Sequence, residues 1–401
     1  MPIALPTNGQ KKREHLLALD GVRGYGFLAI FLGHYLSPVI RSHRSNIFDN
    51  GLYYVAELAW LAVPAFFVLS GYLIGGILFN TRNREGFFKV FYGRRMLRIL
   101  PVYYGTLLVI ACVDLAHGVH LKYLFWSHFI YIQNWMPGYT DSGPEPYNRV
   151  IHLWSLAIEE QFYLTWPLVV WFARDRRRLL KIVAILCAAC WTLRVISPWI
   201  YLSVNRSHLA TPTRVDAILL GVALALVADH KIYKRLQPLA KYAALAGMAL
   251  WIISSSTHLD DPRNYYSVAF EITLGNFVVL ALISAVIDEG SAFARICNVR
   301  WARWLGVMSY GLYVFHYTYY TWFLDSFRPR LLRYMPDPWD YLATAAIALA
   351  VTIMLGVLSF RFIELPALSL RKYLKYGPVR AIAPAPERGT EPVPQLAADS
   401  R

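Results

Sequence analysis

Charged residues are scarce in this 401-residue sequence. Asp, Glu, Lys and Arg together make up 16% of the chain, and 57% of it is hydrophobic. A soluble domain of this length would have about 25% charged residues, so the composition leaves no room for a large soluble domain. Apolar runs of about 20 residues recur along almost the whole chain, and such runs are typical of a polytopic membrane protein.

Three other features are also missing. The first 18 residues begin polar and basic and lack an apolar stretch with a small-residue cleavage site, so we expect no cleavable signal peptide. Among the four cysteines, only Cys187 and Cys190 are close in sequence; they lie in an apolar run with no second ligand pair nearby, so we interpret them as core residues and predict no metal site. No internal repeat is visible, which weighs against transporters built from paired repeats.

The apolar runs predict an all-α polytopic membrane protein with about ten transmembrane helices. Residues 121–135 are apolar and rich in Trp and Tyr but too short to cross a bilayer, so we predict an interfacial or re-entrant segment there. The ten predicted spans are 20–40, 52–79 (with a kink or tilt near Pro64), 99–116, 150–172, 179–199, 212–228, 239–256, 267–287, 303–324 and 339–360.

The net charge of +15 would suggest a nucleic-acid partner in a soluble protein. Here the loops account for it, because 28 Lys and Arg residues lie on one side of the predicted spans and nine on the other. Basic residues accumulate in cytoplasmic loops, so we predict both termini in the cytoplasm and no nucleic-acid partner. We divide the chain into a basic cytoplasmic lead (1–19), a transmembrane domain (20–370) and a cytoplasmic tail (371–401), which is predicted to be disordered from about Ala381.

Tyrosines aside, the ionisable side chains past the entry of the first predicted span are Arg23 and His34. They are 11 residues apart, so in a helix they project from one face, about 16 Å apart along the axis. Ionisable groups in a spanning helix are costly and face a protein interior or a wet cavity. They are therefore candidates for a functional site, although a snorkelling Arg and a core His would explain them equally well.

Three further ionisable residues fall at a depth similar to that of His34 in other predicted spans: Glu159, Asp216 and His316. Pairing around one polar cavity would cost less than exposing each group to lipid, so we predict that the four side chains meet. A His beside a carboxylate is suited to general base catalysis. The alternative is a buried polar network that only sets helix packing. Other residues on or near these faces extend the candidate site, namely Ser155, Arg214 and Tyr310.

Two more motifs stand out. Arg94, Arg95 and Arg98 fall within five residues at the entry to the third span, and clustered guanidinium groups suit phosphate, although such clusters also serve topology or anionic lipids. Small residues at positions 70, 71, 75 and 76 of the second span allow close helix packing or line a narrow tunnel.

Taken together, these motifs resemble the acyltransferase-3 family of bacterial integral membrane acyltransferases. The matching stretches occur in the family's order along the chain. They are LDGVRG with His34 (19–34), PAFFVLSGYLIGG (64–76), RRMLRILPVYY (94–104), HLWSLAIEEQFYLTWP (152–167), TRVDAILLGVAL (213–224), SYGLYVFH (309–316) and FIELPALSL (362–370).

The resemblance implies transfer of an acyl group, often acetyl, from acyl-CoA as co-substrate to a hydroxyl of an acceptor, in the bacterial inner (cytoplasmic) membrane. Acceptors of the family are saccharides, lipid-linked glycans and macrolide-like molecules. The family's essential histidine corresponds to His34 and its companion arginine to Arg23, its S-x-x-x-E pair to Ser155 and Glu159, and its acyl-CoA-handling arginines to Arg94, Arg95 and Arg98.

From these pieces we predict an O-acyltransferase with no permanently bound cofactor. In this hypothesis His34 is the general base on the acceptor hydroxyl and Glu159 orients it, while Arg214, Asp216, His316 and Tyr310 belong to the acceptor site or its polar network. A covalent acyl-histidine is the alternative chemistry, and the side from which the acceptor enters stays open. The alternative function is a transporter or flippase of an acyl group or a lipid-linked sugar, with His34 and Glu159 as a proton relay.

Overall fold

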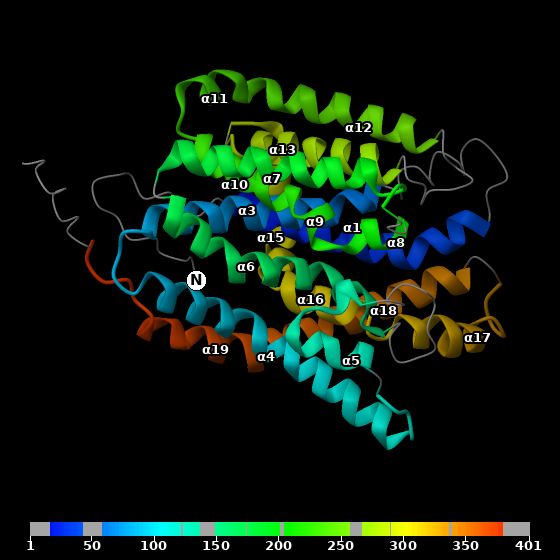
Figure 1. Cartoon of the computed structure of the whole chain (residues 1–401). Coiled ribbons are helices and arrows are strands. Elements are labelled where there is room, and N and C mark those ends of the chain that lie inside the picture. Colours follow the sequence, from blue (N-terminus) through cyan, green and yellow to red (C-terminus); the bar gives the residue numbers. More distant parts are fainter. Residues whose placement is uncertain are drawn as a thin grey trace, which may run out of the picture.

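A computed structural model describes residues 17–42, 58–121, 123–136, 149–173, 175–200, 204–256, 267–288, 290–336 and 339–379. These residues form helices joined by short turns (Figure 1). They contain no β-strand, only an isolated bridge between Arg84 and Val379. The predicted all-α class is confirmed. The tail beyond residue 380, for which we predicted disorder, lies outside the described residues.

Six of the described helical segments are long and apolar enough to cross a membrane, and each coincides with a predicted span. They are Leu58–Thr81, Phe87–Ala116, Arg176–Ile196, Lys231–Ser254, Val268–Ile287 and Trp339–Tyr373. The other four predicted spans fall on helices that are shorter or less apolar: α1 (Leu17–Ser42), α6 (Trp154–Ala173), the pair α9 (Thr211–Arg214) and α10 (Asp216–Val227), and the pair α15 (Arg300–Val307) and α16 (Ser309–His316). The total of ten spans and the cytoplasmic termini stay predictions.

Two boundaries differ from the prediction in ways that matter for the site. The second span is a 3-10 turn, Leu58–Leu61, followed by α3 (Ala62–Thr81), with Pro64 in the first turn of α3, where proline is tolerated. Helix α4 (Phe87–Ala116) begins well before residue 99, so the arginine cluster lies within a helix. The segment 121–135 folds into short turns that include α5 (Tyr123–Ser127), as expected for a piece too short to span.

The remaining helices complete the bundle. The long ones are α7 (Arg176–Ile196), α12 (Ala240–Ser256), α13 (Ile272–Ile287) and α18 (Trp339–Ser359). Helix α12 lies at the edge of the bundle and packs mainly on α13 (Figure 1). The short ones are α8 (Val204–Leu209), α11 (Lys231–Leu236), α14 (Ala292–Cys297), α17 (Arg328–Leu331) and α19 (Leu365–Ser369).

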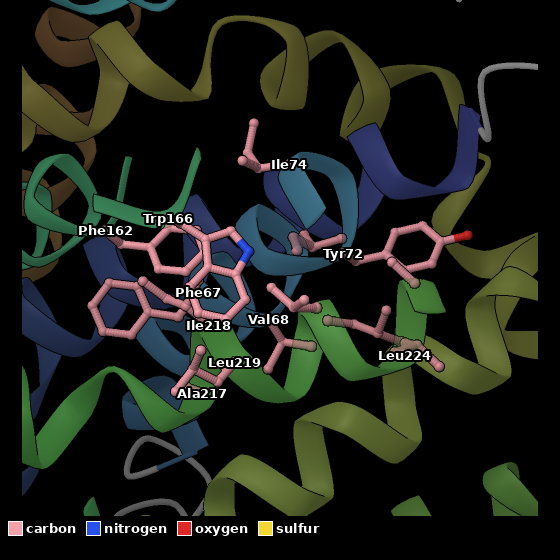
Figure 2. Close-up of a cluster of buried hydrophobic side chains, with 14 of the residues drawn as sticks. Phe67, Val68, Tyr72, Ile74, Phe162, Trp166, Ala217, Ile218, Leu219 and Leu224 are labelled. Carbon is pink, nitrogen blue, oxygen red and sulfur yellow. The ribbon is translucent and has the colours of Figure 1, made fainter. Parts of the chain in front are cut away.

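The core is built around the contact between α3 and α10. Apolar side chains of these two helices and of α6 interlock there, including Phe67, Trp166 and Ile218 (Figure 2). The two backbones approach so closely that a Cβ at Gly71 would lie 1.8 Å from the Ile218 carbonyl oxygen, and one at Gly221 would lie 2.0 Å from that of Val68. Gly71 and Gly75 of α3 therefore serve helix packing, which is one of the two predicted alternatives.

Helix α1 is held against α15 in the same way. A Cβ at Gly24 would lie 1.9 Å from the Ala302 carbonyl oxygen, and one at Gly306 would lie 1.7 Å from that of Asp20. Only glycine allows this approach, because any side chain would push the two backbones apart. The contact fixes the start of α1, and with it Arg23, beside α15.

Candidate active site

A cavity of about 1590 Å³ runs into the bundle between α1, α3, α4, α6 and α16. Its wall follows α3 from Val63 to Asn80, which at 1.5 Å per residue is about 25 Å. Ser70 and Gly76 face this cavity while Gly71 faces α10. Some small residues of the second span thus serve helix packing and others line a cavity, because opposite faces of one helix meet different neighbours. The narrow tunnel stays a prediction.

One end of the cavity is strongly basic. Arg94, Arg95 and Arg98 line it from α4, and Arg371 lines it from the chain after α19. Within the described residues, none of these four guanidinium groups has a carboxylate within 4 Å. Their partners are neutral: the Nε of Arg94 donates to the Leu374 carbonyl at 2.9 Å, and Arg371 donates to the Arg94 carbonyl at 3.3 Å.

Aromatic rings support two of these arginines. The guanidinium carbon of Arg94 lies 5.5 Å from the ring centroid of Tyr376, and that of Arg95 lies 5.1 Å from the ring centroid of Tyr163. Cation–π contacts at such distances orient a guanidinium without neutralising it. Within the described residues the basic end therefore carries guanidinium groups that line a cavity without forming an ion pair, and such an excess of positive charge favours binding of an anion.

The middle of the cavity holds Glu159. Its carboxylate accepts a hydrogen bond from Ser70 Oγ at 2.8 Å and one from the Tyr163 hydroxyl at 3.0 Å. Ser70 Oγ and the Tyr163 hydroxyl are themselves 2.9 Å apart. Arg23 also lines the cavity, and its guanidinium is paired with Asp20 at 2.8 Å. Both hydrogen-bond partners of Glu159 thus belong to α3 and α6, and neither is His34. These contacts do not agree with the prediction that Glu159 orients His34.

Two hydroxyls that contact each other line the far end of the cavity. Ser155 Oγ and the Tyr313 hydroxyl are 2.7 Å apart, and the Tyr313 hydroxyl donates to the His152 carbonyl at 2.8 Å. Phe66 lies beside them, with its ring centroid 6.3 Å from that of Tyr313. Tyr310 lines the same wall and donates to the Ile99 carbonyl at 2.8 Å. We call Ser155 and Tyr313 the hydroxyl barrier.

His34 lies beyond the hydroxyl barrier, in a cluster of histidine and tyrosine rings. Its ring centroid is 5.5 Å from that of His316 and 4.8 Å from that of Tyr317, and His316 is 5.1 Å from His152. Nδ1 of His316 lies 2.6 Å from the Tyr313 carbonyl, and its buried Nε2 has no partner among the described residues. His152 was not among the site residues predicted from the sequence, although it lies only three residues before Ser155.

Asp216 does not join this cluster. Its carboxylate binds Arg194 of α7 at 2.6 Å, with both side chains almost fully buried. Arg194 also donates to the Thr213 carbonyl and to Thr273. Arg214 lies over the ring of Trp154, with its guanidinium carbon 5.6 Å from the centroid. Of the described residues, the cavity wall includes neither Asp216 nor Arg214.

The predicted meeting of His34, Glu159, Asp216 and His316 around one cavity is therefore wrong. The structure brings His34 and His316 together, places Glu159 in the cavity with the arginines, and pairs Asp216 with Arg194. Depth along a helix axis is set by sequence position, but the direction in which a side chain points depends on which neighbours the helix has. Depth alone could not distinguish these three places.

Comparisons with known proteins agree with the resemblance. Residues 16–360 match the family model described as an acyltransferase domain, the acyltransferase-3 family. The chain belongs to this family. With its apolar helices, this membership makes it a multi-pass membrane protein.

Similar curated proteins are O-acetyltransferases. The chain is 31% identical over 380 residues to the peptidoglycan O-acetyltransferase OatA of Listeria monocytogenes, which covers 88% of this chain and 56% of that protein. The putative peptidoglycan O-acetyltransferase YrhL of Bacillus subtilis is 30% identical over 378 residues (88% and 55%), and the O-acetyltransferase OatA of Staphylococcus aureus 26% over 372 residues (88% and 57%). The chain thus spans a little over half the length of these relatives. No solved structure matches it significantly.

Other residues of the cavity were not singled out from the sequence. Tyr163 and Glu160 line the middle, Glu364 lines the wall from the chain before α19, and Arg371 lines the basic end. Glu364 is buried and its Oε1 has no partner among the described residues. The sequence contained a signal for Glu364, because a Glu in an apolar stretch such as FIELP is costly unless its side chain faces a polar space.

Proposed function

We propose that this protein is an acyl-CoA-dependent O-acetyltransferase that modifies a hydroxyl of a cell-envelope saccharide at the inner membrane, with peptidoglycan as the first acceptor to test. The observation that carries the proposal is a group of four arginines at one end of a long cavity, none of which forms an ion pair within the described residues. Coenzyme A has a diphosphate and a 3′-phosphate at one end and a thioester on a thin arm at the other. Its charge distribution complements that of the cavity.

In this arrangement the donor enters at the basic end. The excess of Lys and Arg in the loops on that side supports a cytoplasmic location for the basic end of the cavity. The phosphates bind the arginines, and the arm lies along Ser70 and Glu159 towards Ser155 and Tyr313. The thioester thus reaches the hydroxyl barrier, on whose far side the His34 cluster lies.

His34 is the proposed general base. Within the described part of the chain its imidazole lies against the rings of His316, Tyr317 and Tyr320 and forms no hydrogen bond, so its nitrogens can bind a hydroxyl. A nitrogen of His34 takes the proton from the acceptor hydroxyl, and the oxygen attacks the thioester carbonyl. The new C–O bond forms as the C–S bond breaks, and the thiolate of coenzyme A leaves and is protonated. His316 and His152, beside His34, take the positioning role that we first assigned to Glu159.

The transporter alternative does not need these arginines. A proton relay through histidines would leave a cluster of unpaired guanidinium groups without a ligand, whereas acyl-CoA provides three phosphate groups for it. The family membership favours group transfer as well.

The test is transfer of label from [acetyl-¹⁴C]acetyl-CoA to peptidoglycan fragments by purified protein in proteoliposomes, together with release of free thiol. His34→Ala should lose activity by about 100-fold to 10,000-fold, the range for removing a general base. His117→Ala is the matched control, because His117 is an exposed residue at the end of α4 and does not line the cavity. Equal transfer by the wild type and His34→Ala would refute the role of His34. Absence of thiol release in the wild type would refute the donor.

A further inference from the structure

The chain after α19 returns to the start of α4. A 3-10 turn, Leu370–Tyr373, ends the helical part, and residues up to Val379 follow. We call residues 370–379 the C-terminal strap. The strap lies beyond residues 16–360, which match the family model, and the sequence analysis assigned nearly all of it to the tail.

The strap is fixed to the start of α4 at several points. The backbone N–H of Glu85 donates to the Pro378 carbonyl at 3.1 Å, and that of Gly377 donates to the Glu85 carbonyl at 3.1 Å. An isolated bridge joins Arg84 and Val379. These contacts join backbone groups of the strap to backbone groups before α4, so the path of the strap does not depend on side-chain packing alone.

The strap also positions the arginine cluster. The Leu374 carbonyl accepts from Arg94 Nε at 2.9 Å, and the Tyr376 ring lies against the Arg94 guanidinium. Leu374 packs on Gly93, where an added Cβ would be 2.9 Å from a methyl carbon of the leucine. The strap and α4 therefore form one wall at the basic end.

Arg371 adds a further positive charge to that wall. It lines the cavity and lies close enough to Arg94, Arg95 and Arg98 to be repelled by all three. Its Nε is buried and has no partner among the described residues. A partly buried guanidinium among like charges is unfavourable unless an anion neutralises the group. If a basic residue were needed here only to set the membrane topology, an exposed one such as Lys375 would serve equally well.

We propose that the C-terminal strap is part of the donor site and that Arg371 binds a phosphate group of the nucleotide half of acyl-CoA. This assignment rests on the proposed function. Arg371 provides a fork of N–H donors for phosphate oxygens, and the strap holds both Arg371 and Arg94 at the basic end of the cavity. The catalytic step is not affected by the strap, because the strap lies at the end of the cavity opposite the hydroxyl barrier.

The test compares donors with and without phosphates. Arg371→Ala, Arg371→Lys and the control Lys375→Ala are assayed with acetyl-CoA and with S-acetylpantetheine, which has the same thioester arm and no nucleotide. We expect Arg371→Ala to raise KM for acetyl-CoA about ten-fold or more, with kcat little changed, as for loss of charge-assisted hydrogen bonds made in the ground state. KM for S-acetylpantetheine should not change. Arg371→Lys should recover part of the loss, and Lys375→Ala should behave as the wild type.

Direct binding gives an independent measurement. Adenosine 3′,5′-bisphosphate should raise the melting temperature of the wild type and not that of Arg371→Ala. A rise in KM of equal size for both donors would show that Arg371 only supports the wall, and an unchanged KM for acetyl-CoA would refute the assignment. A defect seen in anionic vesicles but not in zwitterionic ones would identify a lipid headgroup as the partner and also refute it. If the wild type released no thiol from acetyl-CoA, the proposed function itself would fail.

Discussion

The buried pair Arg194–Asp216 provides a prediction that separates a structural role from a catalytic one. Asp216→Asn keeps the shape of the side chain and removes its charge. Arg194, which is completely buried, then loses Asp216, its one carboxylate partner among the described residues, and retains the Thr213 carbonyl and Thr273. At an effective dielectric constant of about 20 and a charge separation of about 4 Å, the lost attraction is about 4 kcal/mol. This agrees with the 3–5 kcal/mol typical of breaking a buried pair.

The double variant Arg194→Met/Asp216→Asn removes both charges. It should be more stable than Asp216→Asn alone, because Arg194 no longer leaves a buried charge without its carboxylate partner. Unfolding by SDS in mixed micelles, followed by tryptophan fluorescence, measures the free energy of unfolding of all three proteins. Asp325→Asn, at an exposed position, is the control and should be neutral.

Activity per folded molecule completes the test. Because Asp216 does not line the cavity or contact the His34 cluster, the folded double variant should keep acetyl transfer within a few-fold of the wild type. If Asp216→Asn were as stable as the wild type but inactive, Asp216 would be a functional residue, and our assignment of it to a structural pair would be refuted.

Two further predictions address packing and the barrier. Gly71→Leu should prevent accumulation of folded protein, because its Cβ alone would lie 1.8 Å from a backbone oxygen. The control Gly105→Ala should fold normally, because nothing lies within 4 Å of a Cβ at that position. Fluorescence-detected size-exclusion chromatography measures the amount of folded protein, and a folded Gly71→Leu variant would contradict the close contact. Tyr313→Phe removes two hydrogen bonds of the hydroxyl barrier and should increase the release of thiol from acetyl-CoA several-fold when no acceptor is present. The control Tyr310→Phe, in the same wall, should not increase it. Equal thiol release by both variants would show that Tyr313 does not separate the donor from water.

The sequence alone was sufficient for the class of the protein. Scarcity of charge and recurring apolar runs indicated helices in a membrane, because a bilayer requires every backbone polar group to be satisfied within the segment. The motifs indicated the family, since their order along the chain is specific. Arg23, Arg94, Arg95, Arg98, Ser155 and Glu159, which were predicted from the sequence, all line one cavity.

The grouping of the buried polar residues was decided only by the tertiary structure. Asp216 is neutralised by Arg194, a residue 22 positions earlier on another helix, and Glu159 is bound by Ser70. No periodicity within one segment encodes which helix will be its neighbour, because that choice depends on close contacts such as Gly71 with Ile218. Arg371 is the clearest case: the sequence shows a basic residue in a tail, and only the return of the chain to α4 places it among the arginines that face the cavity.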